Sequence, residues 1–118
     1  MKVHGREVTF LHSVEADCEI YAMTEGKIEV LEKKWAGDYI TSQRTSAEFM
    51  AALSRASENA KKFEDPDYEK RPLTKEEAMT LDADTFGELF NEAFTAWTRE
   101  KPTIETTPKK GVKKTGKK

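Results

Sequence analysis

Apolar residues recur every three or four positions over most of the first 100 residues, which predicts a chain built from amphipathic helices. The clearest case is residues 45–63, where a Thr45-Ser46-Ala47-Glu48 capping box predicts the first turn. Pro66 predicts the end of this helix. The predicted buried stripe is Phe49, Leu53, Ala56, Ala60 and Phe63, and the predicted solvent-facing side is Arg55, Glu58, Asn59, Lys61 and Lys62.

The first residues alternate in the way that a half-buried β-strand does. Val8 and Phe10 are separated by a polar residue, and Val3 lies on the other side of a turn that contains Gly5. This pattern predicts an N-terminal β-hairpin. An isolated hairpin is only marginally stable, so we expect it to pack on a helix or to join the sheet of another chain.

A second helix is predicted between Ser13 and Gly26. Ser13 is expected to cap its first turn, and Gly26 to end it. The apolar positions at helical spacing are Val14, Cys18, Tyr21 and Ala22, which predicts that Cys18 is a buried small side chain.

Residues 27–44 allow two interpretations. Ile28, Leu31 and Trp35 fit a short helix, whereas Ile28 and Val30 also alternate like a strand. We favour the helix because two lysines near its end suit the helix dipole and Gly37 can end it. Asp38 to Gln43 is predicted to be a connector.

The last third of the chain is predicted to hold a connector and two helices. Pro66 and Pro72 exclude a continuous helix between them. A second capping box at Thr74 predicts a short helix to Thr80, and Asp82 or Asp84 is expected to cap a final helix that ends near Arg99. That helix has a wide apolar face of Phe86, Leu89, Phe90, Ala93, Phe94 and Trp97.

These elements predict a mainly α fold of three to five helices with a short N-terminal hairpin, in one domain over residues 1–101. Residues 102–118 hold six lysines against Glu105, a charge of +5, and are predicted to be a disordered basic tail. Residues 1–101 carry 14 basic and 21 acidic residues, so an acidic body of −7 underlies the net charge of −2. The tail is either a solubilising end or an electrostatic arm built from Lys109, Lys110, Lys113, Lys114, Lys117 and Lys118. It has no aromatic residue to stack on bases, which argues against a nucleic-acid partner.

The sequence offers no pattern typical of catalysis. His4 and His12 are the only histidines, and neither has a second ligand at metal-binding spacing. The acidic run from Glu64 to Asp67 lacks the ligand order of a calcium loop, and the chain has no Gly-rich phosphate loop or nucleophile motif. We therefore expect a protein that is not an enzyme and has no metal or cofactor. A single cysteine, the lack of a membrane-spanning apolar run and the lack of a signal-like N-terminus predict a cytoplasmic location without membrane contact.

The aromatic face of the final helix has two interpretations. It can pack against the other helices as core. Alternatively, part of it is exposed as a face for a partner, and Phe86, Phe90, Phe94 and Trp97 are the candidate residues.

Three stretches together resemble the tail assembly chaperones of long-tailed phages and prophages. They are Val3-His4-Gly5-Arg6-Glu7-Val8-Thr9-Phe10, the 45–63 helix followed by Glu64-Asp65-Pro66, and Arg71-Pro72-Leu73-Thr74 through Trp97. The resemblance implies a mostly helical cytoplasmic protein that binds the tape-measure protein and keeps its long helices soluble while tail-tube subunits polymerise around it.

On that resemblance the expected partners are the tape-measure protein and the tail-tube protein, and self-association is also open. One alternative is a structural tail or head-to-tail joining subunit whose N-terminal hairpin adds to the sheet of a neighbour. A second alternative is a small nucleic-acid-binding regulator that uses the lysine tail.

Overall fold

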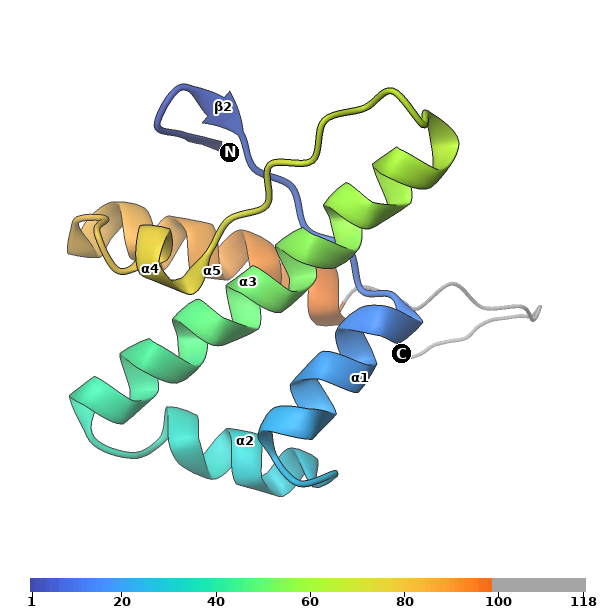
Figure 1. Ribbon diagram of the computed structural model, residues 1–118. Coiled ribbons are helices and arrows are strands. Elements are labelled where there is room, and N and C mark those ends of the chain that lie inside the picture. Colours follow the sequence, from blue (N-terminus) through green and yellow to red (C-terminus); the bar gives the residue numbers. More distant parts are fainter. Residues whose placement is uncertain (99–118) are drawn as a thin grey trace, which may run out of the picture.

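The computed structural model describes residues 1–98 and confirms a mainly helical fold that begins with a β-hairpin (Figure 1). Residues 99–118, on which the predicted stop at Pro102 and the predicted lysine tail fall, lie outside the described residues. None of the helices within residues 1–98 is long and apolar enough to cross a membrane. The elements follow one another as β1 (Lys2–Val3), β2 (Arg6–Glu7), α1 (Val14–Met23), α2 (Ile28–Trp35), α3 (Tyr39–Glu64), α4 (Lys75–Ala78) and α5 (Ala83–Thr98).

The hairpin is shorter than predicted. β1 and β2 pair antiparallel around His4 and Gly5, whose φ angles of 50° and 83° suit a tight two-residue turn. Residues 8–10 continue as extended chain outside the strands. Val3 and Val8 are both buried against the helices, and this burial holds a hairpin that could not stand alone.

Helix α1 begins and ends as predicted. The Ser13 hydroxyl oxygen accepts a hydrogen bond from the Ala16 N–H at 3.2 Å. At the other end the N–H of Gly26 donates to the carbonyl oxygen of Tyr21 at 2.8 Å, and Gly26 adopts a φ of 81°. Glu25, the residue before it, also has a positive φ, of 57°, so Glu25 and Gly26 together form the left-handed turn that closes the helix.

The predicted buried stripe of α1 is wrong. Ala16 and Ile20 are the buried residues of this helix, whereas Val14 is 79% exposed and Cys18 is exposed. Helix α1 packs mainly against α3, so only one narrow strip of it is covered. Because Ala16 is small, the strip through Ala16 and Ile20 lets the two helices approach closely.

Residues 28–35 form helix α2, which decides between the two interpretations in favour of the helix. Leu31 is fully buried, and Ile28 and Trp35 pack against the core while partly buried. The helix ends at Trp35, two residues before Gly37.

Helix α3 begins at Tyr39, so the predicted start at Thr45 and the predicted connector over residues 38–43 are both wrong. Asp38 caps the helix, and its Oδ1 accepts from the N–H of Thr41 at 2.8 Å. An aspartate at this position is as good an N-cap as threonine, and its charge also suits the helix dipole.

The apparent capping box at Thr45 lies inside the helix. Thr45 is buried, and Glu48 does not reach back to it but pairs with Lys75 of α4 at 2.9 Å. The neighbouring Ser46 hydroxyl donates to the carbonyl oxygen of Ser42 at 2.9 Å. Hydroxyl groups that bond to the preceding turn in this way are tolerated within a helix, so the motif alone does not mark a helix start.

Helix α3 is the centre of the fold, because α1, α2, α4 and α5 all pack against it. In Figure 1 it runs diagonally through the molecule, with α1 and α2 below it and α5 behind it. Six consecutive buried residues occupy its middle, and such a run cannot lie on one stripe of a helix. They are Phe49, Met50, Ala51, Ala52, Leu53 and Ser54.

The C-terminal end of α3 departs from the predicted pattern. Phe63, expected in the core, is 91% exposed, and Glu58, expected on the solvent side, is only 3% exposed. In Figure 1 the last turns of α3 extend past the helices packed on it. The stripe side is therefore uncovered at Phe63, whereas Glu58 faces the connector that follows the helix.

The connector and the last two helices agree closely with the prediction. Leu73 is fully buried, and the Thr74 hydroxyl oxygen caps α4 by accepting from the N–H of Glu77 at 3.0 Å. Asp82, rather than Asp84, caps α5. Helix α4 is shorter than predicted and ends at Ala78.

Leu53 and Phe63 test the corrected pattern of α3, because both were predicted to lie on its buried stripe. Leu53→Ala should lower the free energy of unfolding by about 2–5 kcal/mol, since it leaves a cavity in the core. Phe63→Ala should change it by less than about 0.5 kcal/mol. Urea unfolding followed by circular dichroism measures both values. Equal destabilisation by the two substitutions would contradict the exposed end of α3.

Candidate functional site

An aromatic cluster lies where α2, α3 and α5 meet, with Trp35 at its centre. The Trp35 ring meets Phe49, Phe90 and Phe94 edge to face, with centroid distances of 5.1, 5.6 and 6.0 Å. Phe90 and Phe94 stack on each other at 5.9 Å. Aromatic pairs in these geometries each contribute about 0.5–1.5 kcal/mol beyond their burial, so the cluster fixes α2 and α5 on α3.

The fold separates the four aromatic residues that were predicted as a partner-binding face. Phe86 is 7% exposed and belongs to the core, whereas Phe94 is 38% exposed. Phe90 and Trp97 are partly buried and pack against the core. The surface that this helix offers to a partner is therefore formed by Phe94 and the outer edge of Phe90.

Trp97 is engaged within the chain. Its ring stacks on that of His12 with centroids 4.2 Å apart, and its carbonyl oxygen lies 2.8 Å from His12 Nδ1. The other ring nitrogen of His12 lies 2.7 Å from Asp17 Oδ1. Both oxygens are acceptors, so the imidazolium form of His12 makes both bonds and the neutral ring makes one. These contacts fasten the last turn of α5 to the loop that precedes α1.

A groove of about 550 Å³ opens beside Phe90 and Phe94. One wall is α5, and the other is the first turns of α3 at Ser42, Gln43 and Ser46. Gly87 forms part of the α5 wall. The space beside its Cα is open, because a Cβ at this position would have no other atom within 4 Å. The groove is thus an open aromatic trough with one neutral polar wall.

Two further apolar side chains are exposed where α3 begins. Tyr39 is 72% exposed and Ile40 is 61% exposed. Tyr39 precedes Ser42 and Gln43 by one helical turn, which places it on the same face of α3 as the groove wall. The apolar surface therefore extends beyond the groove along α3.

Outside the groove lining, the exposed surface of α5 is negatively charged. Helix α5 carries Asp84, Glu88 and Glu92 and has no Lys or Arg. Like charges at this four-residue spacing repel and destabilise a helix slightly. Glu92 lies 3.3 Å from the amino group of Met1. Within residues 1–98, neither Asp84 nor Glu88 forms a salt bridge.

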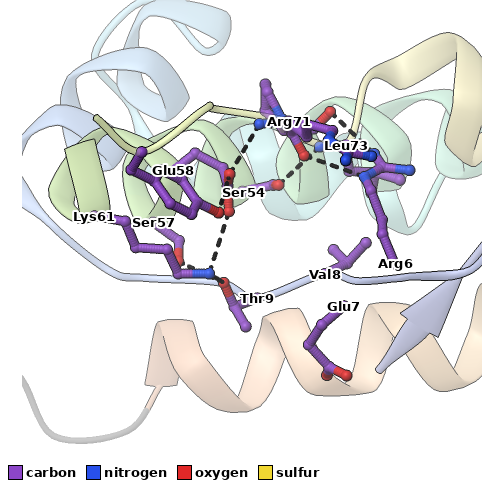
Figure 2. Close-up of polar contacts among 12 residues, drawn as sticks. Arg6, Glu7, Val8, Thr9, Ser54, Ser57, Glu58, Lys61, Arg71 and Leu73 are labelled. Carbon is purple, nitrogen blue, oxygen red and sulfur yellow. Dashed lines mark hydrogen bonds and ion pairs between the residues drawn. The ribbon is translucent and has the colours of Figure 1, made fainter. Parts of the chain in front are cut away.

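A buried polar network on the other side of α3 holds the connector in place. Figure 2 shows Glu58 of α3 facing Arg71. One Glu58 oxygen accepts from the Arg71 N–H at 2.9 Å and the Tyr68 hydroxyl at 2.7 Å, and the other accepts from Lys61 at 3.2 Å. Burial alone would raise the pKa of Glu58, but these hydrogen bonds outweigh it and the pKa lies below its usual value. The carboxylate therefore stays ionised inside the fold.

The same network reaches the N-terminal segment. Lys61 also donates to the Thr9 hydroxyl oxygen at 2.9 Å, and that hydroxyl lies 2.7 Å from the hydroxyl of Ser57 (Figure 2). The Ser54 hydroxyl oxygen accepts from the N–H of Leu73 at 2.8 Å. Three segments distant in the sequence are thus joined through one face of α3.

A second group of polar contacts, between Arg6 of the hairpin and Glu77 of α4, also holds the connector. We call this group the Arg6–Glu77 clasp. The Arg6 guanidinium binds both oxygens of Glu77 at 2.7 Å and donates to the carbonyl oxygens of Arg71 and Pro72 at 3.2 Å each. His4 adds a contact to Glu77 at 2.8 Å. The hydrogen bonds from Arg6 are the main cause that lowers the pKa of Glu77 to about 2.

The sequence predicted neither the Glu58 network nor the Arg6–Glu77 clasp. It assigned Glu58 to solvent, and it assigned the Glu77 side chain to the capping box of α4 rather than to Arg6. One signal was present: Ser54, Ser57, Glu58 and Lys61 recur at helical spacing and form a polar stripe beside the apolar one. No comparable signal links Arg6 to Glu77, because that pair is set by tertiary structure.

The part of the chain that the structure describes contains no group of three or more His, Cys, Asp or Glu residues placed to hold a metal ion. The six predicted tail lysines lie outside the described residues. Comparison with protein-family models, with curated proteins and with solved structures finds no match for this chain. The resemblance to tail assembly chaperones therefore stays a prediction.

The Arg6–Glu77 clasp predicts a specific pH dependence of stability. Glu77 has a depressed pKa in the folded state, so its contribution is fully present above about pH 5 and is lost as the pH falls toward about 2. Glu77→Gln should thus lower the free energy of unfolding by about 1–3 kcal/mol at pH 7 and by much less near pH 2.

Urea unfolding of the original and variant proteins across this pH range measures the difference. Glu76→Gln is the matched control, because Glu76 is the exposed neighbour on α4. A difference for Glu77→Gln that does not change with pH would contradict the clasp.

Proposed function

We propose that this protein acts by contact, as a tail assembly chaperone of a long-tailed phage or prophage that holds an amphipathic helix of the tape-measure protein. The observation that carries the proposal is the open aromatic groove between α3 and α5, set in a charged, folded body. The resemblance in sequence supplies the identity of the partner.

The lining of the groove defines the helix that it fits. The aromatic floor of Trp35, Phe90 and Phe94 suits an apolar stripe, as in other helix-in-groove complexes. Asp84 follows Ala83 of the groove wall and is exposed, so it suits a lysine or arginine beside that stripe. Ser42 and Gln43 of α3 add neutral hydrogen-bonding groups on the opposite side.

The size of the groove matches a short contact. Its α5 wall runs from Ala83 to Phe94, which is about 16 Å of helix. A bound helix would meet it over about three turns, through side chains at positions i, i+3 or i+4, and i+7. Interfaces of this extent belong to the small, transient class, and a chaperone that must leave during assembly needs a contact of that kind.

The charge of the body supports the same role. Residues 1–98 carry 12 basic and 20 acidic residues, and a net charge well away from zero opposes aggregation. A long amphipathic helix exposes an apolar stripe when its partners are missing. Covering part of that stripe with a strongly charged domain would keep it in solution.

The geometry gives less support to a structural subunit that adds its hairpin to a neighbouring sheet. Each strand of the hairpin is two residues long, and Arg6 is tied to Glu77 of the same chain. So short an edge offers few backbone groups to another chain.

Gly87 allows the groove to be closed without weakening the fold. Gly87→Gln should place a side chain over the floor and reduce capture of the tape-measure protein at least tenfold. Gly87→Ala is the matched control: it should raise helix stability by up to about 1 kcal/mol and leave capture nearly unchanged. Co-expression of each form with the tape-measure protein of the same gene cluster, followed by affinity purification, measures capture.

Two outcomes would overturn the proposal. One is a tape-measure protein that is equally soluble without this protein and does not co-purify with it. The other is undiminished capture by both Gly87→Gln and Phe94→Ser, which would move binding away from the groove. Mass spectrometry of purified particles adds a separate test, because a stoichiometric amount of this protein in the virion would favour a structural subunit.

A further inference from the structure

A second cleft, of about 540 Å³, lies on the other flank of α5. It runs between α5 and the extended segment that follows the hairpin. Val8, Phe10 and Ala96 contribute apolar surface, and Asn91 lines both this cleft and the aromatic groove. The two openings are therefore separated by a single ridge of α5.

We propose that the lysine-rich segment of the same chain, residues 102–118, binds in this cleft. The cleft is bordered by Glu7, Glu88 and Glu92. Glu7 and Glu92 each contact the amino group of Met1, whereas Glu88 forms no salt bridge within residues 1–98. The proposed occupant carries six lysines and one glutamate, so the two surfaces are complementary in charge.

The position of Thr98, the last described residue, favours this occupant over any separate molecule. Thr98 lies one helical turn beyond Thr95, and Thr95 lines the cleft. Glu88 is ten residues back along α5, about 15 Å away. The eleven residues from Thr98 to Lys109 can span up to about 36 Å, so every lysine pair can reach the cleft.

Because the lysine-rich segment is part of the same chain as the cleft, weak contacts are sufficient for it to bind there. A single exposed lysine–glutamate pair contributes less than about 1 kcal/mol. A segment joined to its own binding surface by a short linker has an effective concentration in the millimolar range, so several such pairs can hold it there. Binding of this kind must weaken with salt, because the charges are exposed and screened.

The test uses the full-length protein alone, so it stands apart from the proposed function. In a nitrogen-15 NMR spectrum, replacing Lys109, Lys110, Lys113 and Lys114 together by glutamine should shift the amide signals of the cleft. The expected set is Thr9, Phe10, Asn91 and Thr95. Raising the sodium chloride concentration from about 0.05 M to about 0.5 M should reproduce the same shifts in the original protein and not in the variant.

Glu88→Gln supplies the matching change on the cleft side and should produce part of the same shifts. Glu29→Gln on α2 is the control, since it removes an exposed helical carboxylate elsewhere and should leave the cleft signals unchanged. Shifts confined to the substituted residues would overturn the proposal. Shifts that depend on protein concentration would also overturn it, because they would assign the segment to a neighbouring copy.

Discussion

One helix, α3, has to be buried from several sides by helices that pack mainly against it rather than against one another. This constraint explains its composition, because a helix with neighbours all around it needs small side chains where they approach. Ala47, Ala51, Ala52 and Ala56 are all buried, and Phe49 and Leu53 fill the wider gaps between them. The other four helices of the described residues are all placed by their contacts with α3. The position of α5, and with it the groove, is therefore set by packing on one shared helix.

Burial of α3 on the connector side brings polar groups into the interior. A buried carboxylate is strongly unfavourable unless its oxygens are hydrogen-bonded, and Glu58 meets this condition with three donors. Ser54 and Glu58 accept from backbone N–H groups of the connector at Leu73 and Arg71, as a neighbouring strand would in a sheet. The connector thus belongs to the core although it has no regular structure. Arg6 extends the same arrangement to the hairpin by binding connector carbonyl groups and Glu77.

The sequence predicted what local physics decides and failed where tertiary contacts decide. Caps at Ser13, Thr74 and Asp82 were recognisable, because a cap depends on residues a few positions apart. The start of α3 was missed, since the pattern at Thr45 also fits the interior of a longer helix. Periodicity identified the aromatic residues of α5 but could not say which of them α3 covers, so Phe86 and Phe94 looked equivalent. Cys18, Glu58 and Phe63 were misplaced for the same reason: each depends on where neighbouring helices begin and end.

The aromatic groove and the second cleft lie on the two flanks of α5 and are close enough for their occupants to affect each other. Asn91 lines both, and Glu88 of the cleft precedes it on α5 by three residues, which is less than one helical turn. At physiological salt a charge acts over about 8 Å, which is comparable to the width of a helix. Positive charge held in the cleft would therefore repel a basic flank in the groove, and each occupant would weaken the other to the same degree. Salt would act in opposite directions on these two effects, weakening the attraction of a partner to α5 while relieving competition from the chain's own lysines. An affinity that varies little with salt would thus be compatible with strong electrostatic contacts at both openings.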